Sequence, residues 1–205
     1  NVLHNIMRYT NSLQISASDR LTLLQSPGFS GAVSSMFNAL LNGAAVFPYD
    51  VRKEGLGRNL AAWLIGEQIT MYHSVPMIFR SFLTGNGRFP KIRVIRLEGD
   101  AATKVDVELY REHFEQSCLL VNGLGATETG ISRQFFMDRN TRLSGSVVPI
   151  GYGTEGMHGM VVDEAGQDVG MDAVGEIAIR SKYLAPGYWN QPDLTRAAFL
   201  PGPAG

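Results

Sequence analysis

The segment Asn122–Gly130, with the sequence NGLGATETG, combines glycines, threonine hydroxyls and a carboxylate. It follows the apolar run Cys118–Val121, which predicts a buried strand. In open α/β sheets, ligands collect at the carboxyl ends of the strands. Glycine lets backbone amides approach an anion, threonine donates to a phosphate oxygen, and glutamate is a hard oxygen ligand for magnesium. The segment therefore predicts a site for a nucleotide phosphate and Mg²⁺, with Thr127 and Glu128 as its reactive groups.

A second glycine pattern, Gly151–Gly156, matches G-x-G-x-x-G. A dinucleotide site of that type needs a strand before the glycines and a helix that opens on the last one. The residues that follow, Met157–Val162, are strand-like and interrupted by glycine. We therefore interpret this stretch as a turn in a β-region and reject a dinucleotide enzyme.

The first 125 residues alternate between helical and strand-like hydrophobic patterns. Helices are expected near residues 1–14, 33–41, 56–64, 76–83 and 105–114, and strands at residues 20–25, 44–47, 69–72, 92–97 and 119–121. Repeated β-α-β units imply an α/β fold in which helices cover a parallel sheet.

After about residue 130 the pattern changes to short β-type runs between glycine-rich turns. These runs are Val147–Ile150, Gly159–Val162 and Glu176–Ile179, with a hairpin loop at Asp163–Gly166. We therefore expect an α/β subdomain at residues 1–130 that carries the nucleotide and acyl site, and a smaller antiparallel β-rich subdomain at residues 131–200. Residues 201–205 are expected to form a frayed tail.

The composition excludes several classes of function. The 205 residues are 44% hydrophobic and carry 18 basic against 19 acidic residues, so no broad field favours nucleic acid or an anionic membrane. No apolar stretch is long enough to span a bilayer. The lone cysteine, Cys118, cannot form an internal disulfide, which favours a reducing, cytoplasmic setting.

Three segments, in order, resemble the adenylate-forming superfamily of acyl-CoA synthetases, luciferases and nonribosomal peptide synthetase adenylation domains. Phe29–Phe37 is placed like its F-D-x-S-V-W-E-M-F motif, NGLGATETG resembles N-x-Y-G-x-T-E, and Val174–Trp189 resembles its G-E-L-x-I segment with L-A-x-G-Y. Leu97–Asp100 and Val148–Gly151 are supporting matches. The resemblance is collinear with essentially the whole chain.

The resemblance implies that a carboxylic acid and ATP form an acyl-adenylate, whose acyl group then passes to the thiol of coenzyme A or of a carrier protein's phosphopantetheine. Glu128 would bind Mg²⁺ and Thr127 would contact phosphate. The implied nucleotide site also includes Glu98, Gly99, Asp100, Asn122, Gly123, Leu124 and Gly125. The implied acid pocket consists of Ser30, Gly31, Ser34, Glu98, Gly123, Ile131 and Ser132.

Two departures from the superfamily pattern affect the expected ligands. Leu124 replaces a tyrosine, which removes an aromatic face for the adenine worth about 1 kcal/mol. Ser30 replaces the aspartate that pairs with the ammonium group of an α-amino acid, and a serine cannot neutralise a buried cation. We therefore expect a fatty, aryl or keto acid, in a pocket made roomier by Gly31 and Ser34. Glu98 is either a second partner for an ammonium group or a solvated residue at the end of a strand.

Other polar residues carry less information. His73 is interpreted as a loop or core-edge histidine, and the side chains of Arg96 and Lys182 are long enough to reach a phosphate. The superfamily's phosphate loop, its ribose-binding Y-R-T-G-D segment and its lid with the catalytic lysine do not occur in the sequence. We therefore expect these residues to be the middle of an adenylation domain, inactive without its remainder.

Three hypotheses remain open at this point. The first is an adenylation domain of a peptide synthetase or hybrid assembly line that activates a non-α-amino acid. The second is a stand-alone acyl-CoA or acyl-AMP ligase. The third is a non-catalytic binding module that keeps the fold, although the Thr127–Glu128 pair has no obvious packing role in such a module.

Overall fold

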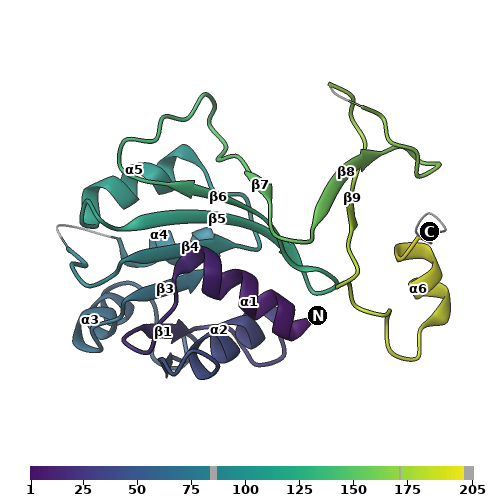
Figure 1. The fold of residues 1–205 in the computed structure, drawn as a ribbon. Helices are drawn as coiled ribbons and strands as arrows, with labels where there is room; N and C mark the ends of the chain where they lie inside the picture. Colours follow the sequence, from purple (N-terminus) through teal and green to yellow (C-terminus); the bar gives the residue numbers. More distant parts are fainter. Residues whose placement is uncertain (84–86, 171, 201–205) are drawn as a thin grey trace.

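The computed structural model describes residues 1–83, 87–170 and 172–200. Seven strands form one sheet: β1 (Arg20–Leu23), β2 (Ala45–Pro48), β3 (Met71–Ser74), β4 (Val94–Glu98), β5 (Leu119–Ala126), β6 (Gly130–Met137) and β7 (Tyr152–Gly153). Their order is β2-β1-β3-β4-β5-β6-β7. Figure 1 shows β3, β4, β5 and β6 side by side in this order. The pairings from β2 to β5 are parallel, and those of β5 with β6 and of β6 with β7 are antiparallel.

Helices separate the parallel strands along the chain and cover both faces of the sheet. They are α1 (Val2–Leu13), α2 (Ser30–Leu40), α3 (Arg58–Gly66), α4 (Pro76–Phe82) and α5 (Lys104–His113). Residues of α3, α4 and α5 belong to one buried cluster, whereas residues of α1 and α2 belong to another. The sequence-based prediction of a parallel sheet covered by helices is therefore confirmed.

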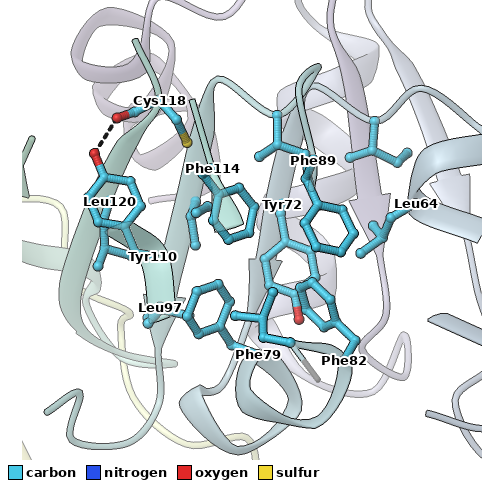
Figure 2. Packing of buried hydrophobic residues seen from close by; sticks show 14 of the residues in the cluster. Leu64, Tyr72, Phe79, Phe82, Phe89, Leu97, Tyr110, Phe114, Cys118 and Leu120 are labelled. Carbon is cyan, nitrogen blue, oxygen red and sulfur yellow. Dashed lines mark hydrogen bonds between the residues drawn. The ribbon is translucent and has the colours of Figure 1, made fainter. Parts of the chain in front are cut away.

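The larger hydrophobic core is rich in aromatic side chains. Figure 2 shows Tyr72 of β3 beside Phe79 and Phe82 of α4, with Phe114 close by. Strand β4 contributes Ile95 and Leu97 to this core, while Val94 packs into the second cluster. Because side chains alternate across a strand, Arg96 and Glu98 share a face with Val94 and point toward α1 and α2.

The smaller sheet pairs β8 (His158–Val162) with β9 (Glu176–Arg180) in an antiparallel hairpin, as the sequence predicted. Asp163–Gly166 forms its expected turn, closed by a bond from Gly166 N–H to the Asp163 carbonyl. Helix α6 (Pro192–Ala198) follows and contains no buried residue. Its start was not predicted, although Pro192 in the first turn and Asp193 beside it are typical helix-start residues.

Two predictions for the glycine-rich region have different outcomes. Gly151–Gly156 lies on β7 and the turn after it, and the next described element is strand β8, so its interpretation as a β-region turn is confirmed. The predicted strand Val147–Ile150 is wrong, because only Val147 forms an isolated bridge, to Thr103. Pro149 has no N–H to donate to a ladder.

The predicted change of subdomain at residue 130 falls inside the β5–β6 hairpin, since β6 and β7 belong to the larger sheet. Among the described residues, no helix is long and apolar enough to cross a membrane. The predicted frayed tail, residues 201–205, lies outside the described residues.

Candidate functional site

Strand β5 continues through the glycine-rich segment, which corrects the prediction that the strand ends at Val121. Pairing with β4 and β6 extends it to Gly123, and pairing with β6 alone extends it to Ala126. The hairpin turn consists of residues 127–129. Gly130 then adopts φ +64°, and an added Cβ would lie 2.5 Å from Asn5 Oδ1. Glycine is therefore required where β6 begins.

This turn lies at the first residue of α2. The Thr127 hydroxyl donates to Ser30 Oγ at 3.2 Å, across 97 positions of sequence. Helix α1 supports the turn from the other side, where Arg8 donates to the carbonyls of Thr129 and Ile131. The fold thus brings together Ser30 and Thr127, which the sequence placed in one site.

The environment of Glu128 suits a single metal ligand. Glu128 is only partly buried and lies on the turn between β5 and β6. In the described part of the chain, no three His, Cys, Asp or Glu side chains gather to form a metal cluster. Mg²⁺ in nucleotide sites is commonly bound by one or two carboxylates together with phosphates and water, so one glutamate fits this role.

Glu98 has a different environment, because several donors surround its carboxylate. Arg96 donates to Glu98 Oε1 from Nε at 3.1 Å and from Nη2 at 3.0 Å, and the Tyr9 hydroxyl lies 3.0 Å from both oxygens. The Arg96 guanidinium also stacks 3.8 Å from the centre of the Tyr9 ring. Arg96 is 2% exposed, so its charge needs this partner.

His73 completes this group, which we call the Glu98 cluster: Tyr9, His73, Arg96 and Glu98. Its Nε2 lies 3.4 Å from Glu98 Oε2, and its Nδ1 lies 3.0 Å from the hydroxyl of Ser35. This arrangement favours the tautomer that carries the proton on Nε2. The expectation of a loop or core-edge histidine is refined, since His73 lies in β3 and is buried.

Burial and charge shift the pKa values of the cluster. Burial and then the positive charge of Arg96 lower the pKa of His73. Burial alone would raise the pKa of Glu98, but the charge of Arg96 and the bonds from His73 and Tyr9 outweigh it and lower that pKa well below its usual range. At neutral pH the cluster therefore contains one ion pair and a neutral histidine, and has no net charge.

The Glu98 cluster packs against the small residues of the predicted acid pocket. A Cβ at Gly123 would lie 2.8 Å from Glu98 Cγ, and one at Gly31 would lie 3.5 Å from His73 Cε1. Ser34 Oγ is 3.5 Å from Arg96 Nη2. A cavity of about 10 Å³ beside Arg96 and His73 has room for one water at most. A roomier pocket beside Gly31 and Ser34 stays a prediction.

The other predicted site residues fall into two groups. Gly99, Asp100 and Gly125 are exposed at the ends of β4 and β5, and Leu124 is half-buried beside them. Asn122, Ile131 and Ser132 are buried and bonded within the protein: Asn122 Nδ2 donates to the Pro149 carbonyl at 3.0 Å, Ser132 Oγ donates to the Leu124 carbonyl at 2.9 Å, and the Ile131 carbonyl accepts from Arg8.

Of the two long cationic side chains considered for a phosphate, Arg96 and Lys182, Arg96 is not available. Arg96 is buried and bonded to Glu98, which corrects the idea that it could reach one. Lys182 Nζ lies 5.1 Å from the centre of the Tyr183 ring.

Sequence reasoning missed two tyrosines of the site. Tyr9 belongs to the Glu98 cluster, and its spacing from Ile6 and Leu13 marked the buried face of α1. Tyr188 donates a hydrogen bond to Glu128 Oε1 from a segment 60 positions away. This bond, together with the negative charge of Glu128, raises the pKa of Tyr188.

The fold and the site define an α/β protein whose candidate ligand groups lie at the carboxyl ends of parallel strands, where ligands of such folds collect. The family model described as AMP-binding enzyme matches residues 1–189, and the chain belongs to this family. The resemblance to adenylate-forming enzymes is thereby confirmed.

Curated relatives include large peptide synthetases. Tyrocidine synthase 1 of Brevibacillus parabrevis is 30% identical over 198 residues, which are 95% of this chain and 17% of the relative. Surfactin synthase subunit 2 of Bacillus subtilis (strain 168) is 30% identical over 97% of this chain and 6% of its own. The chain thus spans a small part of the curated relatives that it matches.

Solved structures share the fold. CmiS6 superposes with a TM-score of 0.85 and 26% identity, over 97% of this chain and 48% of its own. The nonribosomal peptide synthetase FmoA3, solved also in an AMPPNP-bound form, gives a TM-score of 0.84 with 22% identity over 96% of this chain and 22% of its own.

Proposed function

We propose that these residues form part of a domain that adenylates a carboxylic acid with ATP and passes the acyl group to a phosphopantetheine thiol. The observation that carries the proposal is the contact of Thr127 with Ser30, because it joins the predicted phosphate-binding turn to the predicted acid pocket. Membership of the AMP-binding family supports a nucleotide at this turn.

In the proposed reaction a carboxylate oxygen of the acid attacks the α-phosphorus of ATP, and pyrophosphate leaves with the electron pair of the broken P–O bond. Catalysis of this step is mainly positioning and neutralisation of charge. Thr127 donates to a phosphate oxygen, and Glu128 binds the Mg²⁺ that neutralises the phosphates. Ser30, the first residue of α2, is exposed beside Thr127 and lines the proposed acid site.

The proposed acid lacks an α-ammonium group. Ser30 cannot neutralise a cation, and the Glu98 carboxylate is already paired with Arg96 at 3.0 Å. An ammonium group brought near Glu98 would compete with a buried guanidinium for the same two oxygens. The sequence left two interpretations of Glu98 open, a second partner for an ammonium group and a solvated residue at the end of a strand. Our proposal adopts neither, because Glu98 forms an internal ion pair with Arg96.

Pyrophosphate exchange tests the proposal in a complete adenylation domain that contains these residues, with fatty, aryl, keto and α-amino acids compared. We expect exchange with at least one acid that lacks an α-ammonium group, and a loss of roughly 100-fold in Glu128→Gln because a metal ligand contributes several kcal/mol. Glu164→Gln, in the β8–β9 loop, is the matched control and should exchange like the parent.

Three outcomes would contradict parts of the proposal. If no acid supports pyrophosphate exchange, the proposed adenylating activity is wrong. If α-amino acids support exchange best, the inference from Ser30 and Glu98 that the acid lacks an α-ammonium group is wrong. Acyl transfer to free coenzyme A in preference to a carrier protein favours the stand-alone ligase.

A further inference from the structure

The segment between β9 and α6 crosses the turn that contains Glu128. The Ala185 N–H donates to the Glu128 carbonyl at 2.8 Å, and the Tyr188 hydroxyl donates to Glu128 Oε1. Before these contacts, Tyr183 stacks on His4 of α1 with 3.4 Å between ring centres. We call residues 181–189 the strap, because they join the β8–β9 region to Glu128 by two hydrogen bonds and to α1 by one aromatic stack.

Tyr188 is itself fixed by the elements that follow it. Its N–H donates to Thr195 Oγ1 at 2.9 Å, and its carbonyl accepts from the Gln191 N–H at 3.2 Å. Its ring packs edge-on against Phe199, with 5.6 Å between centres. Helix α6 thus determines where the Tyr188 hydroxyl lies, although α6 buries none of its own residues.

The hydrogen bond from Tyr188 distinguishes the two carboxylate oxygens of Glu128. Oε1 accepts from Tyr188, and no donor among the described residues bonds to Oε2. A phenol that donates to one oxygen of a carboxylate restricts its rotation without adding charge. In metal sites such outer partners orient the ligand and strengthen binding.

We propose that Tyr188 is a positioning residue for Glu128: it binds Oε1 so that Oε2 faces the metal ion of the bound nucleotide. This inference rests on the proposed function, because it takes Glu128 as the Mg²⁺ ligand. It assigns a role in nucleotide binding to the strap and, through Thr195 and Phe199, to α6.

The test compares Tyr188→Phe with the parent in a complete adenylation domain. Binding of Mn²⁺ in the presence of AMPPNP is measured by electron paramagnetic resonance, and pyrophosphate exchange is measured as a function of Mg²⁺ concentration. Tyr188→Phe should weaken Mn²⁺ binding about 10-fold and raise the Mg²⁺ concentration for half-maximal exchange similarly, with little change at saturating Mg²⁺. Tyr152→Phe, at an exposed tyrosine, is the control and should match the parent.

The other results separate the possible failures. Tighter Mn²⁺ binding in Tyr188→Phe would overturn the proposal, because Tyr188 would then compete with the metal. Unchanged Mn²⁺ binding and unchanged Mg²⁺ dependence would overturn it as well. If the parent and Glu128→Gln bind Mn²⁺ with AMPPNP equally, the assignment of Glu128 as the metal ligand fails, and the proposed function fails with it.

Discussion

Glu98 and Glu128 lie near the carboxyl ends of adjacent strands of one sheet, yet their surroundings are opposite. Glu98 is bonded to Arg96 and Tyr9 and lies 3.4 Å from His73 Nε2, so its charge is neutralised inside the protein. Glu128 lies on a turn, where its side chain has one described donor, the Tyr188 hydroxyl. A carboxylate beside a predicted site is available to a cation only where the protein leaves its charge unpaired, as at Glu128.

The same difference separates stability from binding. An ion pair as buried as that of Arg96 and Glu98 contributes little net stability compared with apolar residues, but loss of one partner leaves an uncompensated buried charge. A partly exposed carboxylate such as Glu128 carries no such penalty. Removal of either charge of the Arg96–Glu98 pair should therefore destabilise the protein, and changes at the turn should not.

The largest effect is expected for Arg96→Met, which leaves the Glu98 carboxylate buried without its cation. The free energy of unfolding, measured by urea denaturation at pH 7, should fall by about 3–5 kcal/mol. Arg52→Met is the matched control at an exposed arginine, and it should change this free energy by less than about 0.5 kcal/mol. Equal values for the two variants would remove the distinction between the regions.

A smaller loss is expected for Gly123→Ala. The new Cβ would lie 2.8 Å from both Glu98 Cγ and Ile131 Cδ1, so these side chains must shift. The free energy of unfolding should fall by about 1–3 kcal/mol, as in other overpacked interiors. Gly145→Ala, where nothing lies within 4 Å of the added Cβ, should be neutral. A neutral Gly123→Ala would show that the cluster is loosely packed.

Acid should destabilise the protein through the same cluster. Because the pKa of His73 is lowered on folding, the unfolded chain binds more protons as the pH falls through about 6.5, and stability decreases. The pKa of Glu98 is also lowered, so its contribution is present above about pH 5 and is lost below it. Urea denaturation from pH 8 to pH 4 should show a continuous decline.

His73→Gln separates the two contributions to this decline. It should reduce the slope between about pH 7 and pH 5.5 and leave the loss at lower pH. If the stability of the parent rises on acidification, both signs are wrong.

The structural features that depend on local sequence patterns could be predicted from the sequence. Hydrophobic spacing located helices α1 to α5 and the parallel strands, and the glycines of residues 122–130 marked the candidate site. The length of β5 was missed because pairing with β4 and β6 extends it through glycines.

The polar contacts of the site could not be predicted from the sequence, because the fold brings their residues together from distant positions. Tyr9 and Glu98 are 89 positions apart, and Tyr188 and Glu128 are 60 apart, so no local spacing relates them. One signal was available for the ion pair: Arg96 and Glu98 are two residues apart in a predicted strand, and so must share a face.

The most direct test of the central claim is the free energy of unfolding of Glu98→Gln beside that of Glu128→Gln, measured by urea denaturation at pH 7. We predict a loss of about 3 kcal/mol or more for Glu98→Gln, because Arg96 loses its counter-charge, and a change within about 0.5 kcal/mol for Glu128→Gln. Equal losses in the two variants, or a larger loss in Glu128→Gln, would contradict it.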